Sequence, residues 1–307
     1  MIIGNRGIGL GWRYYLCAMI GSALLYYILL KPISLLPHRV LYGVSNFFFV
    51  VIYYLVGYRK KVVFKNLQNS FPEKSEAELK DIMKKFYKHF CDLVVESVKN
   101  FSISKASAER RMLTVDAEVM NRYAEKGQSV ILCGGHYANW EFWAVAGPLP
   151  LKHNVVALYK KLRNDYFDKK MQESRGKFGL RLVRTLDTGE LFKNEHDKNI
   201  AVVFGFDQSP ANPKKCVWVT FLGQETGALF GAEKYAKDYN LPIIYAEQNK
   251  LSRGHYQTRY ELLTENPREF ANGEITQLLH TRLEQDIRKA PEYWLWSHKR
   301  WKHKRPQ

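Results

Sequence analysis

The stretch from Ser129 to Trp143 constrains the fold of this chain more than any other. Its run Val130–Cys133 is apolar throughout, which is typical of a strand covered on both faces of a sheet. Gly134 and Gly135 follow, and they allow a sharp turn in which the backbone comes close to a ligand. Asn139 then predicts a helix cap. Together these features predict an open α/β sheet that binds its ligand at the carboxyl ends of its strands.

Two side chains of this stretch can carry acid–base chemistry. His136 follows the glycines, and Glu141 lies five residues later. On one continuous helix they would point about 140° apart, so they can meet only if His136 precedes the helix. A carboxylate that fixes the tautomer of an imidazole makes it a better general base for a hydroxyl group. The alternative is an ordinary loop histidine and an acid that favours the helix dipole, so the choice depends on the rest of the chain.

No Gly-x-Ser-x-Gly elbow lies near His136. That favours direct transfer to a bound alcohol over a covalent enzyme intermediate.

The charge of the chain limits the class of its partners. Lys and Arg number 47 against 30 Asp and Glu, a net charge of +17. Such a surplus attracts nucleic acid, anionic lipid headgroups or an acidic carrier protein. The basic residues are scattered and no recognition motif accompanies them, so we expect no nucleic acid as a partner. Aromatic residues make up 14 % of the chain, and with the basic residues they suit a membrane interface as well as RNA. The hydrophobic N-terminus favours the membrane.

The cysteines show no pattern of a metal site. No two lie at metal-ligand spacing, and none has a nearby histidine as a zinc motif would. We expect buried free thiols in a reducing compartment, and neither a metal nor a cofactor. The four residues are Cys17, Cys91, Cys133 and Cys216.

Two apolar runs lie within residues 1–60. The run Tyr14–Leu30 is nearly uncharged, and as a helix it would span about 25 Å, close to the lower limit for crossing a bilayer. Lys31-Pro32 follows it where a signal peptide would have a cleavage site. The second run, Leu41–Gly57, could span the bilayer or lie in its interface. We therefore expect a membrane anchor over 1–60 and a separate domain over 61–307.

The rest of the chain predicts an α/β fold. An amphipathic helix is expected from Ser75 to Asn100, with Ser75 and Glu78 as a capping box. Strands and helices then alternate, which implies a mixed, largely parallel sheet flanked by helices. The expected strands are Asn154–Tyr159, Asn199–Phe206, Leu241–Glu247 and His255–Leu263, and the expected helices are Asp165–Phe178, Gly227–Tyr239 and Phe270–Lys289.

Several blocks together resemble the bacterial lipid A biosynthesis acyltransferases, the late or secondary acyltransferases of the lauroyl and myristoyl type. The most specific is Gly135–Glu141, similar to the family's His-x4-Asp/Glu signature. The resemblance covers most of the chain. The other matching residues are Arg59, Asn66-Leu67, Phe71-Pro72, Glu96, Tyr159 through Asn164, Asp168, Arg175, Gly179, Asp207-Gln208, Phe221-Leu-Gly223, Thr226 and Pro291–Trp301.

This resemblance implies a glycerol-phosphate-acyltransferase-like fold with an acyltransferase catalytic domain over 61–307. The acyl donor would be an acyl carrier protein thioester, and the acceptor a hydroxyl of a lipid A precursor. His136 would be the general base, oriented by Glu141. The enzyme would be bound to the inner membrane with its catalytic domain on the cytoplasmic face. The implied substrate-binding residues are Asn139, Tyr159, Lys160, Asn164, Arg175, Asp207, Gln208, Gly223, Thr226, Lys299 and Arg300.

The chain departs from the family pattern after Tyr159. The family usually has Arg-Pro there, and this chain has Lys160-Lys161, which keeps the charge but loses the bidentate fork of arginine. Two alternatives stay open. One is a related membrane acyltransferase that acts on another glycolipid, a glycerophospholipid or an amino-acid lipid, and the other is a basic membrane-anchored binding protein without activity.

Overall fold

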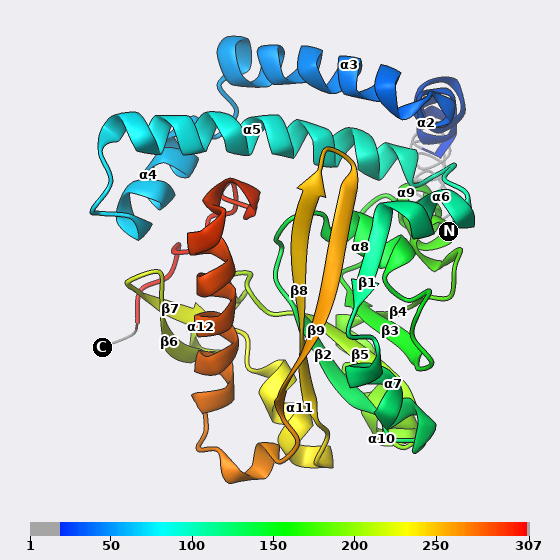
Figure 1. Ribbon diagram of the computed structural model, residues 1–307, viewed down its shortest axis with the longest axis vertical. Coiled ribbons are helices and arrows are strands. Elements are labelled where there is room, and N and C mark those ends of the chain that lie inside the picture. Colours follow the sequence, from blue (N-terminus) through cyan, green and yellow to red (C-terminus); the bar gives the residue numbers. More distant parts are fainter. Residues whose placement is uncertain (1–18, 306–307) are drawn as a thin grey trace, which may run out of the picture.

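The computed structural model describes residues 19–305 and consists of a central sheet covered by helices (Figure 1). The sheet has seven strands in the order β1-β9-β8-β2-β5-β3-β4. All neighbouring strands in it are parallel except the antiparallel pair β8–β9. The strands are β1 (Met112–Val115), β2 (Val130–Gly134), β3 (Asn154–Tyr159), β4 (Arg181–Arg184), β5 (Ile200–Gly205), β8 (Ile243–Ser252) and β9 (His255–Thr264).

The strands in the middle of this sheet are apolar because helices cover them. Residues 130–133 of β2 are all buried, as are residues 200–202 of β5. The connecting helices are α6 (Lys105–Arg111), α7 (Glu118–Glu125), α8 (Trp140–Ala146), α9 (Asp165–Gly176), α10 (Thr188–Glu195), α11 (Gly231–Tyr239) and α12 (Glu274–Lys289). A separate hairpin of β6 (Val217–Phe221) and β7 (Gln224–Ala228) lies beside α12 (Figure 1).

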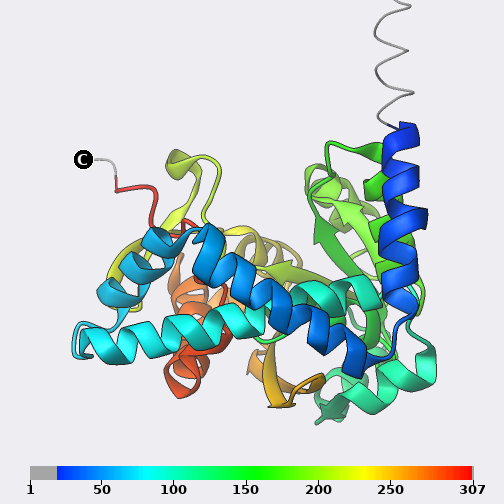
Figure 2. The ribbon, with the colours of Figure 1, turned by 90° about the horizontal axis from the view of Figure 1, so that it is seen from above.

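The longest helix, α5 (Glu76–Lys99), links the N-terminal helices to the sheet. Ser75 accepts a hydrogen bond from the backbone of Glu78, whose side chain accepts one in return, so the predicted capping box is confirmed. The helices before it are α2 (Lys31–Leu35), α3 (His38–Phe49), which continues into the π-helical Val50–Val56, and α4 (Lys60–Ser70). In both views α3 runs over α5 (Figures 1 and 2).

One described helix, His38–Val56, is long and apolar enough to cross a membrane by length and composition. The helix Met19–Leu35 is shorter than such a span. Residues 14–18 of the predicted first run lie outside the described residues. These helices are weak evidence for a membrane anchor, because helices of soluble proteins can meet the same criterion.

The predicted mixed, largely parallel sheet flanked by helices is confirmed. The expected helix Gly227–Tyr239 is wrong in its first part, where Gly227 and Ala228 end strand β7 and the helix begins only at Gly231. The last expected helix begins at Glu274, after a short 3-10 turn at 267–269. Cys91 and Cys133 are buried free thiols as expected, whereas Cys216 is half-buried and Cys17 lies outside the described residues.

Candidate active site

His136 lies just beyond the carboxyl end of β2, where the sequence predicts a ligand site. A Cβ atom on Gly135 would lie 2.7 Å from the side chain of Leu283 in α12, so a larger residue in the turn would displace Leu283. Gly134 pairs with Gly205 of β5, and Asp207 follows that strand. The parallel register thus brings Asp207 to the same edge of the sheet as His136.

The carboxylate of Asp207 holds His136 by two hydrogen bonds. One oxygen lies 2.6 Å from Nδ1 of the imidazole, and the other accepts the backbone N–H of His136 at 2.9 Å. The indole N–H of Trp294 donates to that second oxygen at 2.8 Å. Asp207 is only 2 % exposed, so these contacts replace water around its charge. We call His136 and Asp207 the dyad.

The other ring nitrogen of His136 is the one that can accept a proton. With Nδ1–H donating to Asp207, the lone pair is on Nε2. Nε2 lies 2.9 Å from the side-chain amide nitrogen of Gln208, which is a donor. An acceptor hydroxyl that replaces this amide would meet the same lone pair.

Charge in the dyad favours the imidazolium. Burial opposes protonation of His136, but the charge and hydrogen bond of Asp207 outweigh it and raise its pKa above the ordinary value. The negative charge of Glu141 acts in the same direction. Burial alone would raise the pKa of Asp207, but the charge of His136 and hydrogen bonds from it and Trp294 hold this pKa far below its usual range. Asp207 therefore stays ionised while His136 gains and loses a proton.

Glu141 does not hold the imidazole as the sequence interpretation expected. Its carboxylate forms a paired contact with Arg175 of α9, with nitrogen–oxygen distances of 2.8 to 3.1 Å. Both side chains are half-buried, and a guanidinium is the better match for a carboxylate than one ring nitrogen. Asp207 takes the predicted orienting position, and Glu141 contributes its charge.

The turn that carries His136 is fixed on both sides. Ala138 has φ +51°, an unfavourable value for a residue with a Cβ. Its N–H donates to the carbonyl of Tyr293, and its carbonyl lies 2.8 Å from Nε2 of His89 in α5. The N–H of Leu295 donates to the carbonyl of His136. The C-terminal block and α5 thus support the strained turn between them.

An apolar pocket of about 130 Å³ opens beside the dyad, and His136 forms part of its wall. It extends between the carboxyl ends of the central strands and helix α8. Its other lining residues are mostly small or aromatic: Gly134, Gly135, Trp140, Trp143, Ala144, Ala157, Val203, Gly205, Ala246 and Gln248. For comparison, an enclosed cavity of about 150 Å³ lined by Leu, Ile and Phe binds a benzene-sized hydrocarbon. The pocket suits part of an aliphatic chain.

A family model of the bacterial lipid A biosynthesis acyltransferases matches residues 13–303. The chain belongs to this family. The predicted resemblance is thereby confirmed, and the dyad and apolar pocket lie in a member of an acyltransferase family that acts in lipid A biosynthesis. No curated protein matches the chain.

Two asparagines that the family resemblance assigns to substrate binding are helix caps in this acyltransferase. Asn139 is fully buried, accepts from the backbone of Phe142 and donates to Glu96, so it has no face toward a substrate. Asn164 caps α9 and donates to the hydroxyl of Ser22. The prediction for Asn139 is corrected, because its buried side chain is occupied in positioning α8, whereas Asn164 is half-buried and its substrate contact stays a prediction.

Three residues expected to bind substrate belong to the packing around the β6–β7 hairpin. Gly223, at φ +71°, forms its turn. Thr226 is buried and accepts from the indole of Trp301. Arg300 is 2 % exposed and donates to the carbonyl of Gly227, and burial lowers its pKa to about 10. Burial therefore leaves Arg300 no free face for the substrate contact expected of it, whereas Lys299 is exposed.

Tyr159 and Lys160 lie on the dyad's side of the sheet. With Arg175 they line a cavity of about 60 Å³ at the carboxyl end of β3. Because β3 and β2 both run parallel to β5, this cavity lies at the same edge of the sheet as His136. The Arg175 in its wall also binds Glu141, so the structure brings Tyr159, Lys160 and Arg175 together.

The sequence interpretation missed the role of Trp294, the tryptophan that donates to Asp207. It also left the pocket-lining Trp143 and Gln248 without a role. Nothing in the local pattern of Trp294 points to a partner 87 residues away. No group of three or more His, Cys, Asp or Glu that could hold a metal ion occurs among residues 19–305.

Proposed function

We propose that the chain transfers a fatty acyl group from an acyl carrier protein thioester to a hydroxyl of a lipid A precursor. The observation that supports this most directly is the dyad of His136 and Asp207, which opens onto an apolar pocket. Acyl transfer to a hydroxyl requires a base for the alcohol and an apolar place for the hydrocarbon chain.

The acyl group passes directly to the bound alcohol, without a covalent enzyme intermediate. Nε2 of His136 takes the proton of the acceptor hydroxyl as its oxygen attacks the thioester carbonyl carbon. The tetrahedral intermediate then collapses, the carbon–sulfur bond breaks, and the proton on Nε2 passes to the leaving thiolate. The products are an ester and a free thiol, and His136 returns to its neutral form.

Asp207 and Glu141 support this proton transfer in different ways. Asp207 fixes Nδ1–H and stabilises the imidazolium by direct contact. Glu141 adds negative charge from a greater distance, balanced by Arg175. The backbone N–H of His136 is already bonded to Asp207, so it is not free to stabilise the oxyanion. The proposal assigns stabilisation of the oxyanion to Lys160, an exposed cation at the same edge of the sheet.

A carrier protein as donor fits the charge of this sheet edge. Lys160, Lys161 and Arg163 form an exposed basic loop after β3. A carrier protein is acidic, and such a loop would guide it so that its thioester reaches the pocket.

Membrane contact fits the outer face of α3 and its continuation. Val40, Phe47, Val50, Tyr54 and Leu55 are all exposed there, so the helix is apolar on its outside as well as where it packs. A helix of that kind is covered by lipid rather than by water.

The packing of α3 supports a position along the bilayer surface. Tyr42 contacts Glu96 and Ser45 contacts Asp92, so α3 runs antiparallel to α5 over successive turns. Helix α5 has exposed lysines at 80, 84, 85 and 88, which keep it in water or among anionic headgroups. Because α3 is bonded to α5 along its length, we place it in the interface with the catalytic domain on the cytoplasmic side, where carrier proteins are.

The function is tested with the purified full-length protein. It is incubated with acyl carrier protein thioesters of 10 to 16 carbons and with vesicles of a lipid A precursor, a glycerophospholipid or another glycolipid. The expected product is the lipid A precursor with one added acyl ester, measured by mass spectrometry. If only another lipid is acylated, the proposed acceptor is wrong and that lipid is the acceptor. If the acyl group is transferred from coenzyme A but not from the carrier protein, the proposed donor is wrong. Absence of any product with every donor and acceptor would remove the proposed activity.

The apolar pocket predicts a substitution that selects acyl chains. Ala157→Leu adds three carbon atoms to the pocket wall and excludes about three methylene groups of the acyl chain. At about 0.8 kcal/mol for each buried methylene, the loss is about 2.4 kcal/mol. We expect kcat/KM for the preferred donor to fall by about 50-fold, with donors shorter by several carbons much less affected. Competition assays with mixed thioesters measure this ratio.

The matched control for this substitution is Ala77→Leu on the exposed side of α5. It adds the same side chain away from the pocket, so the donor ratio should stay at the wild-type value. An equal loss for all chain lengths in Ala157→Leu would show that the pocket does not hold the acyl chain.

A further inference from the structure

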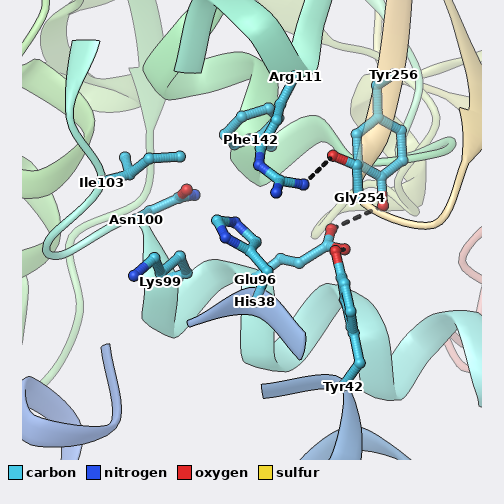
Figure 3. Close-up of a pocket in the computed structure, with 10 residues that line it drawn as sticks. All are labelled: His38, Tyr42, Glu96, Lys99, Asn100, Ile103, Arg111, Phe142, Gly254 and Tyr256. Carbon is cyan, nitrogen blue, oxygen red and sulfur yellow. Dashed lines mark hydrogen bonds between the residues drawn. The ribbon is translucent and has the colours of Figure 1, made fainter. Parts of the chain in front are cut away.

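Glu96 is a buried carboxylate that the proposed reaction does not use. It lies on α5 with 5 % exposure, and its two oxygens face different parts of the fold. Oε1 accepts from the hydroxyl of Tyr42 in α3 at 2.8 Å. Oε2 accepts from the side-chain amide of Asn139 at 2.6 Å and from the hydroxyl of Tyr256 in β9 at 2.7 Å. Figure 3 shows Glu96 between Tyr42 and Tyr256.

The side of α5 that carries Glu96 holds the catalytic turn at successive points. His89 lies against the carbonyl of Ala138, and Glu96 binds the side chain of Asn139. Asn100 donates to the backbone carbonyl of Glu141 at 3.1 Å. Ala138, Asn139 and Glu141 all lie within five residues of His136. Helix α5 therefore sets the position of the turn and of the first turn of α8.

Helix α5 also holds α3 and the segment just before it. Tyr42 of α3 donates to Glu96, and Ser45 of α3 donates to Asp92. The ammonium of Lys99 donates to the carbonyls of Ser34 and Leu36, which precede α3. Within residues 19–305, Glu96 is the α5 side chain that hydrogen-bonds both to α3 and to the turn that carries His136.

The surroundings of Glu96 make these bonds strong. Glu96 is buried, and the cavity of about 10 Å³ next to it has room for no more than about one water molecule, so little solvent competes with the three donors. Lys99 and Arg111 also line that cavity, but they donate to the carbonyls of Ser34 and Gly254 and not to Glu96. Leaving a buried donor without its acceptor is costly, so the carboxylate keeps Tyr42, Asn139 and Tyr256 in one arrangement.

We propose that Glu96 is a positioning residue that connects the bilayer-facing helix α3 to the cap of the catalytic helix α8, so that seating α3 on lipid sets the position of His136. The connection runs from Tyr42 through Glu96 to Asn139, three residues after the base. This inference rests on the proposed acyl transfer for its kinetic effect, and on contact of α3 with lipid for its direction.

The kinetic test uses Glu96→Ala and Glu96→Gln in the full-length protein. Alanine removes every acceptor, and we expect kcat with the best carrier thioester to fall by about 10²-fold, because small displacements of a catalytic group have effects of that size. KM for the donor should stay unchanged, since Glu96 touches no substrate. Glutamine keeps an acceptor for Asn139 and Tyr256, and it should restore kcat to within a few fold of wild type. Wild-type kcat in Glu96→Ala would overturn the proposal, as would a glutamine variant no better than alanine.

A control variant separates positioning from general stability. Tyr260→Phe removes another buried hydroxyl of β9, which bonds the carbonyl of Gly147 at the far end of α8. Tyr256→Phe removes the hydroxyl that bonds Glu96. We expect Tyr256→Phe to lower kcat more than Tyr260→Phe does at a similar loss of thermal stability. Equal effects on kcat would assign both tyrosines to packing alone.

The connection to lipid is tested without activity. Hydrogen exchange of residues 137–146 is measured before and after adding vesicles of phosphatidylglycerol and phosphatidylethanolamine. Wild type should become more protected there, whereas Tyr42→Phe should keep the protection of residues 38–56 and lose that of 137–146. Wild-type protection of 137–146 in Tyr42→Phe would overturn the connection. If the wild type transfers no acyl group to any acceptor, the proposed function fails, but this exchange measurement still decides the role of Glu96.

Discussion

Replacing His136 with alanine is expected to lower kcat by 10²-fold or more while the fold stays intact. A general base contributes about 10²- to 10⁴-fold, and the one ring nitrogen that can accept the hydroxyl proton is lost with the side chain. The hydrogen bonds that hold the turn come from its backbone and from Tyr293 and Leu295, so they remain. Turnover of the acyl carrier thioester is measured with saturating lipid acceptor, and folding is checked by thermal denaturation.

The control for this prediction is His153→Ala. His153 is also buried, and its ring lies 3.0 Å from the carbonyl of Gln128, away from the dyad. Its loss should lower stability with little change in kcat. Wild-type turnover by a folded His136→Ala protein would exclude His136 as the base and leave the apolar pocket without its chemistry.

The local parts of the site could be predicted from the sequence. The apolar run Val130–Cys133 and the two glycines after it dictate a buried strand and a close turn, and the cap at Asn139 sets the start of α8. The capping box of α5 is equally local. These features depend on neighbours in the sequence, so pattern and chemistry were enough to place them.

The partner of His136 could not be predicted in this way. Glu141 is five residues away and has the right chemistry, but Asp207 reaches the imidazole because β2 and β5 pair in register. That register is set by the whole sheet. Glu141 instead accepts hydrogen bonds from Arg175, which lies on α9. Competition between two carboxylates was decided by packing that no local spacing shows.

The hairpin β6–β7 shows the same limit at the level of secondary structure. The sequence predicts one helix over residues 227–239, because the helical pattern of α11 includes the residues just before Gly231. Gly227 and Ala228 become a strand because they pair with Trp218 and Val217. A short strand of this kind depends on its partner, so its sequence alone does not define it.

Asp207→Asn is the second substitution with a large expected effect. One carboxylate oxygen of Asp207 accepts from the backbone N–H of His136 and from the indole of Trp294. In the variant these two donors would hold the amide oxygen of the asparagine at the same position. Its amide nitrogen would then face Nδ1 of His136 and donate to it. The ring proton moves to Nε2, which removes the lone pair that accepts the hydroxyl proton. We expect kcat to fall by about 10²- to 10⁴-fold, the range seen when a base histidine is held in the wrong tautomer.

The pH profile distinguishes this effect from a loss of folding. In the wild type Asp207 raises the pKa of His136, so kcat/KM should fall as the pH drops through that raised value. Without the carboxylate the imidazole protonates less readily. The acidic limb of the kcat/KM profile should therefore move to lower pH, and the plateau value of kcat/KM should be lower than in the wild type. Asp286→Asn removes another buried carboxylate, bonded to Tyr245 and Arg282, and should leave the acidic limb in place. An acidic limb at the wild-type pH in a folded Asp207→Asn protein would mean that a group other than His136 gives up its proton there. The dyad would then not be the base.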